Sequence, residues 1–240
     1  MIDIHTHILP NLDDGPDSVE ESFSIINMAY LHGTKGMIFT PHFLVGSFIN
    51  NRDIVKSQYN QFVIKAKDLF PDMEFFYGSE TMISPHMLNH LRNKEICTLN
   101  DTSYILLELP FINYRTWIDD VIDSIIKMGF NVIIAHPERC EALYKNIEIV
   151  ERIAGESVYF QINAGSFLGI YGKTVKSFAD FLLEKGRVSF IASDAHSTRT
   201  RNAVMQPAYE YVSRLKGEAF AKKIFVENPG KMLGDEKINI

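Results

Sequence analysis

Cysteine and long apolar runs are scarce in this sequence of 240 residues. Its two cysteines, Cys97 and Cys140, stand alone and form no CxxC motif, so we expect reduced thiols rather than a disulfide framework. No apolar run approaches the roughly 18 residues that a membrane span requires. Met1 leads directly into a strand-like segment, without the basic start and apolar stretch of a signal peptide. We therefore expect a cytoplasmic protein that does not insert into a membrane.

Positive charge is also in short supply. The chain has 24 Lys and Arg against 30 Asp and Glu, which gives a net charge of -6. A nucleic-acid surface needs clustered basic side chains to neutralise phosphates, so nucleic acid is not an expected partner, whereas a cation site is compatible with this charge. Hydrophobic residues make up 46% of the chain, which is enough for a sizeable core. We expect residues 1–240 to form one α/β domain.

Short apolar segments alternate with segments of helical periodicity along the chain. The predicted strands are Met1–Ile4, Gly36–Thr40, Glu74–Tyr77, Tyr104–Leu107, Asn131–Ala135, Val158–Ile162 and Ser189–Ala192. The predicted helices are Ser18–His32, Arg52–Leu69, Tyr114–Met128, Cys140–Arg152, Val175–Lys185, Ala203–Leu215 and Glu218–Val226. Ser18 followed by Glu21 is typical of a capping box, and Gly33 is the expected stop. Such alternation predicts parallel strands joined by right-handed crossovers, in a closed barrel or in an open doubly wound sheet.

Residue types that bind metals follow most of the predicted strands. In chain order they are His5, His7, His42, Glu80, Glu108, His136, Asp194 and His196. In a barrel the carboxyl ends of all strands open on one face and converge on one axis, so these side chains would meet in one pocket. An open sheet would spread them apart. The positions of the polar residues therefore favour the barrel.

Each of these residues also has an ordinary structural interpretation. A lone histidine at a strand end is more often a hydrogen-bonded structural residue than a ligand, and we assign that role to His32, His86 and His90, which lie in a helix end or polar loops. His5-x-His7 differs, because alternate strand residues point to the same side and both imidazoles can reach one ion. Asp194-x-His196 repeats this spacing. A buried, unpaired Glu108 would cost several kcal/mol unless a cation compensated it.

Six short motifs carry a resemblance to a known family: "DIHTH", "TPH", "GSE", "LLEL", "AHPER" and "SDAH". In this order they resemble the motifs of the PHP (polymerase and histidinol phosphatase) superfamily. "DIHTHILPNLDDG" together with "AHPER" is similar, more narrowly, to the manganese-dependent protein-tyrosine phosphatases found with bacterial capsule and exopolysaccharide operons. The resemblance runs from residue 2 to about residue 205. It implies a distorted (β/α)7 TIM-like barrel, the PHP fold, with a site for up to three metal ions.

The resemblance also implies which residues hold the metals. One ion would be held by His5, His7, Glu80 and Asp194, a second by Glu80, Glu108 and His136, and a third by Asp14, His42 and His196. Asp13 stays open as an alternative to Asp14, because spacing does not separate adjacent residues. Imidazoles and carboxylates without a thiolate suit Mn²⁺, Fe²⁺ or Zn²⁺, and the resemblance favours Mn²⁺.

A phosphatase reaction at such a site needs a nucleophile and groups that bind phosphate. Clustered ions would lower the pKa of a bridging water from about 16 toward ~7 and so give a hydroxide. Arg139 and Arg201 are expected to bind phosphate as a bidentate fork, although a surface ion pair is the alternative for each and Arg199 competes with Arg201. His196, Asp194 or a metal-bound water could act as the general acid. A phenolate leaving group, with a pKa of ~10, needs little such help.

Aromatic residues near the predicted pocket are candidates for substrate binding. Phe43 and Phe48 follow the second strand, and Phe111 and Tyr114 follow Glu108. We predict that Phe43 and Tyr114 stack on a phosphotyrosine ring or line a docking rim, although such residues are more often anchors of the core or of a loop. The resemblance implies that the substrate is the tyrosine-rich tail of a bacterial tyrosine autokinase that controls polysaccharide export.

Other functions need to be weighed against this one. A cysteine-based tyrosine phosphatase is excluded, because Asn146 and Ser103 stand where Arg is needed after Cys140 and Cys97. An amidohydrolase could share His-x-His and a late Asp, but it would not require Glu80, Glu108 and His196 together. A small-molecule phosphatase of the histidinol-phosphatase type would use the same metals with different loops. A regulatory binding module that holds metals only for stability is the alternative of another class.

Overall fold

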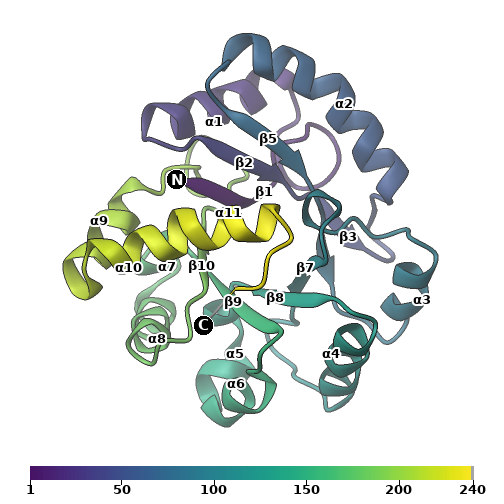
Figure 1. Ribbon diagram of the computed structural model, residues 1–240, viewed down its shortest axis with the longest axis vertical. Helices are drawn as coiled ribbons and strands as arrows, with labels where there is room; N and C mark the ends of the chain where they lie inside the picture. The colour runs from purple at the N-terminus through teal and green to yellow at the C-terminus, as the bar shows by residue number, and fades with distance from the viewer. Residues whose placement is uncertain (239–240) are drawn as a thin grey trace.

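The computed structural model describes residues 1–238, and its strands form a distorted barrel surrounded by helices (Figure 1). The strands are β1 (Ile2–Thr6), β2 (Gly36–Phe39), β3 (His42–Leu44), β4 (Phe48–Ile49), β5 (Glu74–Tyr77), β6 (Glu80–Met82), β7 (Tyr104–Glu108), β8 (Asn131–Ala135), β9 (Val158–Asn163) and β10 (Phe190–Ala192). All seven predicted strands are confirmed within one or two residues at each end. β3, β4 and β6 were not predicted, because each has only two or three residues and no alternating pattern of its own.

The distortion arises where two strands break. The hydrogen-bonded strands form one sheet of order β1-β2-β5 and another of order β10-β9-β8-β7-β6-β3-β4. β3 continues β2 after Pro41, which has no amide hydrogen to donate to a ladder. β6 continues β5 after Gly78, where a Cβ would lie 2.7 Å from the side chain of Leu99. The second half of each strand therefore enters the larger sheet, and both breaks lie immediately before a predicted metal ligand.

The barrel closes between its first and last strands. Thr6 forms a parallel bridge with Ala195, and the His7 amide donates to the Ala195 carbonyl at 2.8 Å. Further from the mouth, the Asp3 carboxylate accepts from the Ser193 amide at 3.0 Å and so replaces a backbone carbonyl. An open doubly wound sheet would leave these two strands far apart. The prediction of a (β/α)7 barrel over an open sheet is confirmed.

Helices cover the outside of the strands, as Figure 1 shows. They are α1 (Val19–Leu31), α2 (Arg52–Leu69), α3 (Met87–Arg92), α4 (Trp117–Lys127), α5 (Glu141–Lys145), α6 (Ile147–Ile153), α7 (Ala164–Phe167), α8 (Lys173–Glu184), α9 (Gln206–Lys216), α10 (Glu218–Lys222) and α11 (Asn228–Leu233). Shorter helical turns are η1 (Leu99–Asp101), η2 (Pro137–Arg139) and the π-helical η3 (Lys223–Glu227). Ser18 caps α1 as predicted, because its hydroxyl accepts from the Glu21 amide at 3.2 Å.

Four details of the helix prediction were wrong. The predicted helix Cys140–Arg152 is divided at Asn146, whose side chain caps α6. The predicted helix Glu218–Val226 continues through η3 into α11. α3 and α7 were not predicted, and His90 lies in α3 rather than in a polar loop. Apolar periodicity misses these features because short helices contain fewer than two full turns and a cap inside an apolar pattern leaves that pattern intact.

The C-terminal segment closes the base of the barrel, at the amino ends of β7 and β9. Asp235 accepts hydrogen bonds from the amide and hydroxyl of Ser103, at 2.8 and 2.7 Å. The Tyr104 hydroxyl donates to the Glu236 carbonyl at 2.6 Å. Among residues 1–238, no helix is both long and apolar enough to cross a membrane. That residues 1–240 form a single domain stays a prediction.

Candidate metal centre

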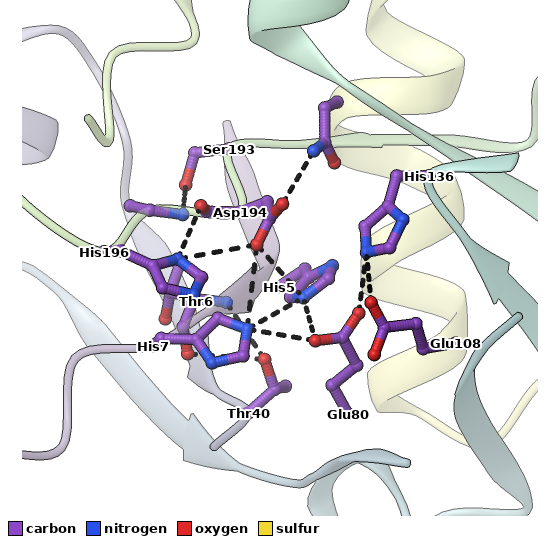
Figure 2. Close-up of polar contacts among 12 residues, drawn as sticks. His5, Thr6, His7, Thr40, Glu80, Glu108, His136, Ser193, Asp194 and His196 are labelled. Atoms are coloured by element: carbon purple, nitrogen blue, oxygen red, sulfur yellow. Dashed lines mark hydrogen bonds and ion pairs between the residues drawn. The ribbon is translucent and has the colours of Figure 1, made fainter. Parts of the chain in front are cut away.

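The mouth of the barrel gathers all nine predicted metal ligands, most of which Figure 2 shows pointing toward one another. They come from six strands or the loops that follow them: His5 from β1, His7 and Asp14 from the loop after β1, His42 and Glu80 from the first residues of β3 and β6, Glu108 from the end of β7, His136 after β8, and Asp194 and His196 after β10. All are buried except His42 and Asp14, which are partly exposed. Barrel closure thus brings together side chains from positions 5 to 196 of the chain.

Glu80 lies at the centre of this cluster. Its Oε1 lies within hydrogen-bond distance of His136 Nε2, at 2.8 Å (Figure 2). Its Oε2 lies 3.3 Å from His5 Nε2, 3.2 Å from His7 Nε2 and 3.0 Å from His42 Nδ1. One carboxylate therefore faces four imidazoles with both of its oxygens, which is the arrangement that a bridging ligand requires.

The side chains form three overlapping groups, each compact enough to surround one cation. The groups are His5, His7 and Glu80; His42, Glu80 and Glu108; and His7, Asp14, His42 and His196. The first group lacks Asp194 of the implied set, whose Oδ1 lies 3.5 Å from His5 Nε2, and the third contains the implied Asp14, His42 and His196 with His7 in addition. In the second group His42 takes the place expected for His136, whose Nε2 is 3.7 Å from Glu108 Oε1.

Asp13 and Asp14 have different roles in the geometry. Asp13 Oδ2 lies 2.6 Å from His7 Nδ1 and also accepts from the His42 amide at 2.9 Å. It therefore orients a ligand from behind, as second carboxylates do in metal sites. Asp14 Oδ1 instead lies 3.1 Å from His196 Nε2 and 3.4 Å from His42 Nε2. The geometry favours Asp14 as a metal ligand and Asp13 as the residue that orients His7.

The donor atoms of the cluster fit a divalent cation. Glu80 Oε2, His42 Nδ1 and His196 Nε2 are buried atoms without a hydrogen-bond partner, although each lies close to an oppositely charged or polar neighbour. Leaving such groups unsatisfied costs free energy, and a cation between them would offset that cost. Imidazole nitrogens and carboxylate oxygens are the donors preferred by Mn²⁺, Fe²⁺ and Zn²⁺.

The protein alone holds an unusual set of proton affinities in this cluster. Burial opposes charge on His5, but Glu80 and Asp194 outweigh it and raise the pKa of His5 to about 9. Burial and the charge of Glu80 raise the pKa of Glu108 to about 8. Burial and the neighbouring His7 lower the pKa of His196 to about 4. Protons thus take up part of the positive charge that the carboxylates require, and a metal ion must displace them to bind.

Two candidate ligands have backbone conformations that favour glycine. His136 has φ 31° and Asp194 has φ 56°, at the ends of β8 and β10. The left-handed region is costly for residues with a Cβ, and it is found most often where surrounding structure and function maintain it. At both positions the turn directs the side chain into the mouth of the barrel instead of along the outer face.

Both predicted arginines reach the cluster. Arg139 Nη1 donates to Asp194 Oδ2 at 2.9 Å, and Arg201 Nη2 donates to Asp194 Oδ1 at 2.7 Å. The guanidinium group of Arg139 also lies between the rings of Phe111 and Tyr171, at 4.9 and 4.8 Å from their centres. This sandwich holds the planar group in place. Arg199 makes no ion pair in the described residues, so the geometry favours Arg201 over it.

The predicted substrate-binding roles of Phe43 and Tyr114 were wrong. Phe43 is 2% exposed and packs into the core, with its ring 5.3 Å from that of His90, because strand alternation points it away from the side that His42 faces. The Tyr114 hydroxyl donates to Asp119 Oδ1 at 2.6 Å, so its ring anchors the start of α4.

Other aromatic residues border the mouth in their place. The Phe48 ring stacks on His42 with 5.9 Å between ring centres. The Phe111 ring lies 5.7 Å from that of His136, and its side chain is 38% exposed. Phe48 and Phe111 belong to the same two segments as Phe43 and Tyr114, but neither spacing nor composition shows which member of an aromatic pair faces a pocket.

Three residues that touch the site were not predicted: Gln161, Asn163 and Tyr171. Gln161 lies 2.8 Å from His5, and Asn163 donates to Asp194 at 2.7 Å. A signal was present in the sequence, because Gln161-x-Asn163 ends a predicted strand with the same spacing as His5-x-His7. Amide side chains are seldom ligands for transition metals, so this spacing alone does not predict residues of a metal site.

Comparison with known proteins gives the same result over the whole chain. The family model described as "Capsular polysaccharide synthesis, CpsB/CapC" matches residues 1–234. The tyrosine-protein phosphatase CpsB of Streptococcus pneumoniae is 34% identical, with 99% of this chain and 100% of the relative covered. The tyrosine-protein phosphatase YwqE of Bacillus subtilis is 32% identical, with 99% and 93% covered.

Solved structures agree with these matches. A structure from a study of YwqE from Bacillus subtilis and CpsB from Streptococcus pneumoniae, described as unique metal-dependent tyrosine phosphatases, superimposes with a TM-score of 0.94. It is 30% identical and covers 100% of this chain and 96% of its own. Histidinol phosphate phosphatase from Lactococcus lactis superimposes with a TM-score of 0.55 at 12% identity, over 93% and 95% of the two chains, and shows the same fold.

Proposed function

This chain belongs to the CpsB/CapC family of capsular polysaccharide synthesis, and we propose that it is a metal-dependent phosphatase of phosphotyrosine proteins. The relatives that cover its full length are named tyrosine-protein phosphatases. The observation that carries the proposal is Glu80, a buried carboxylate that faces four imidazoles with both oxygens. Glu80, the four imidazoles and the neighbouring Asp14, Glu108, Asp194 and His196 together offer donors for several metal ions at the mouth of the barrel.

We propose Mn²⁺ as the native metal, in up to three positions, with Fe²⁺ or Zn²⁺ as alternatives. The nine residues at the mouth would hold the ions: His5, His7, Asp14, His42, Glu80, Glu108, His136, Asp194 and His196. When bound, such ions lower the pKa of a coordinated water from about 16 toward ~7, which makes hydroxide available as a nucleophile near neutral pH. The cluster contains no thiolate, because both cysteines are buried elsewhere and unpaired.

Two buried free thiols also support our proposal that the protein acts in the cytoplasm.

Arg139 and Arg201 are proposed to bind the phosphoryl group. Both guanidinium groups already converge on the Asp194 carboxylate, which marks the point where anionic oxygens are stabilised. A phosphoryl group that enters beside Asp194 would meet donors from two directions, and each arginine can offer a second N–H. The sandwich of Phe111 and Tyr171 keeps Arg139 oriented before substrate arrives, so little entropy is lost on binding.

Protonation of the leaving group places weak demands on the protein. A phenolate has a pKa of ~10 and departs more readily than an alkoxide. The lowered pKa of His196, about 4, keeps this imidazole neutral at pH 7, so it suits a ligand better than a proton donor. Asp194 is ionised, because His5 and Arg201 overcome the effect of burial and lower its pKa. We therefore assign both residues to binding and charge stabilisation rather than to general acid catalysis.

The proposed substrate is the phosphorylated tail of a bacterial tyrosine autokinase that acts in capsular or extracellular polysaccharide synthesis. The family description and the names of the relatives support this choice. The experiment compares turnover of a phosphotyrosine peptide, histidinol phosphate and p-nitrophenyl phosphate by protein that is stripped with chelator and reloaded with Mn²⁺, Fe²⁺ or Zn²⁺. We expect peptide turnover that requires added metal. A preference for histidinol phosphate would support the small-molecule alternative, and absence of any metal-dependent hydrolysis would support a metal-stabilised binding module.

A further inference from the structure

Two amide side chains at the end of β9 connect metal ligands on opposite sides of the barrel closure. Gln161 and Asn163 are fully buried and point to the same side of β9. Gln161 Oε1 lies 2.8 Å from His5 Nδ1, and Gln161 Nε2 donates to Asn163 Oδ1 at 2.9 Å. Asn163 Nδ2 in turn donates to Asp194 Oδ2 at 2.7 Å. An unbroken chain of three hydrogen bonds therefore joins His5 to Asp194.

The polarity of this chain is fixed at one end. An ionised carboxylate only accepts hydrogen bonds, so Asn163 must present its NH₂ group to Asp194. Its oxygen then faces Gln161, which must present its own NH₂ group there. The remaining Gln161 oxygen faces His5 Nδ1, and this nitrogen must carry the proton. In the neutral imidazole the lone pair is therefore on Nε2, which lies 3.3 Å from Glu80 Oε2 and faces the candidate metal site.

We propose that Gln161 and Asn163 are positioning residues that make the charge of Asp194 select the metal-binding tautomer of His5. This inference rests on the metal centre of the proposed function. It differs from the arrangement at His7, whose Nδ1 contacts the Asp13 carboxylate directly at 2.6 Å. At His5 the neutral Gln161 amide accepts from Nδ1 in place of a carboxylate, and it adds no further negative charge beside Glu80 and Asp194.

The chain is held in place by a buried carboxylate beneath it. Glu138 Oε1 accepts from the backbone N–H of Asn163 at 2.9 Å and from the Ser166 hydroxyl at 2.6 Å. Glu138 belongs to η2, directly before Arg139. One side chain thus ties the turn that carries Arg139 to the end of β9 and the start of α7. This support holds the backbone at Asn163, from which the side chain reaches Asp194.

The test measures metal binding and the protonation of His5, without substrate. Mn²⁺ is titrated into metal-stripped wild type, Gln161→Leu and Asn163→Ala by calorimetry. We expect dissociation constants ~10- to 100-fold weaker in both variants, the range found when groups that orient a ligand are removed. Asn228→Ala is the matched control, because Asn228 is a buried amide that donates to the Ser189 carbonyl at 2.8 Å, away from the site. It should lower the melting temperature and leave the dissociation constant unchanged.

The second measurement observes the predicted tautomer directly. In Zn²⁺-loaded protein with ¹⁵N-labelled histidine, His5 should show a slowly exchanging Nδ1 proton, with Nε2 bound to the metal. Gln161→Leu should lose that slow exchange. Gln161→Glu should keep it, because an acceptor remains at His5, yet should still bind Mn²⁺ more weakly, because the new oxygen repels Asn163 Oδ1.

The outcomes separate this inference from the proposed function. Wild-type metal affinity in Gln161→Leu or Asn163→Ala, or a proton on Nε2 of His5 in the Zn²⁺-loaded wild type, would overturn the inference whether or not the protein is a phosphatase. If Gln161→Leu does not fold, the wild-type spectrum and Gln161→Glu still decide it. A failed phosphatase assay with the expected affinities would instead overturn only the substrate and reaction.

Discussion

The two ends of the barrel use polar side chains in opposite ways. At the base, hydroxyl groups donate to backbone or carboxylate oxygens, as between Tyr104 and the Glu236 carbonyl or Ser103 and Asp235. At the mouth, five imidazoles and four carboxylates crowd together, and several of their atoms have no hydrogen-bond partner. Tyr104 and Ser103 at the base find their partners within the protein, whereas the unpartnered atoms at the mouth would be satisfied by a cation. This difference is the usual division of the barrel fold, with stability at the amino ends of the strands and chemistry at the carboxyl ends.

The largest expected effect tests the mouth. We expect His136→Ala to lower kcat/KM for a phosphotyrosine peptide by more than the ~10²- to 10³-fold that loss of one preorganised donor causes. Stability should change little, by about 2–4 °C in melting temperature, because the core is built beneath the site. His32→Ala, at the end of α1, is the control and should keep full activity. Wild-type kinetics in His136→Ala would remove this residue from the proposed ligands.

The next effect separates an arginine at the mouth from one on the surface. Arg139→Ala should weaken transition-state binding by ~2–4 kcal/mol, a loss of about 30- to 1000-fold in kcat/KM. Arg139→Lys should recover only part of it, because an ammonium group cannot form the bidentate fork. Arg187→Ala is the matched control, since Arg187 pairs with Glu151 on the surface. Equal kinetics in Arg139→Ala and Arg187→Ala would contradict the role in phosphate binding.

A third test concerns Asp3, a buried carboxylate that no histidine neutralises directly. Burial outweighs its hydrogen bonds from Ser193 and raises its pKa to about 6. A raised carboxyl pKa means that the folded state binds the proton more tightly, so the contribution of Asp3 to stability is fully present below pH 4 and is lost as the pH rises through 6. From the shift between 3.8 and about 6, the loss is about 3 kcal/mol.

Asp3→Asn should therefore abolish this fall. In metal-stripped protein, urea unfolding should give similar stability for the variant and the wild type near pH 4, and a more stable variant at pH 8. Asp68→Asn, at an exposed position on α2, is the control and should follow the wild-type curve. Parallel curves for wild type and Asp3→Asn would show that Asp3 gains enough from its neighbours to remain ionised at no cost.

The smallest expected effect tests the base. Tyr104→Phe removes the hydroxyl that donates to the Glu236 carbonyl and keeps the buried ring. The free energy of unfolding should fall by ~1 kcal/mol, as for a typical hydrogen bond, and kcat/KM should stay at the wild-type value. A loss of activity comparable with that of His136→Ala would mean that base and mouth are coupled, and would undo the comparison.

Much of the fold was predictable because local signals were strong. Apolar strand segments predicted seven of the ten strands in the described residues, and Ser18 and Gly33 marked the ends of α1. The break at Asn146 and the short strands β3 and β6 were not predictable. The two short strands depend on Pro41, Gly78 and the packing of Leu99, which act through neighbouring strands, and the break depends on the cap formed by the Asn146 side chain.

The sequence by itself determined which chemistry the protein offers. Residue types, their spacing and their order predicted the barrel and eight candidate ligands, because strand alternation and the common direction of the strands require such residues to converge. The family resemblance added Asp14 and, together with their position, the two arginines. The tertiary structure alone decided which side each neighbour faces. It gave Asp14 and Asp13 different roles, turned Phe43 inward, placed Tyr171 against Arg139 and linked His5 to Asp194 through Gln161 and Asn163. Such contacts join residues distant in the chain, and their geometry exists only after the barrel has closed.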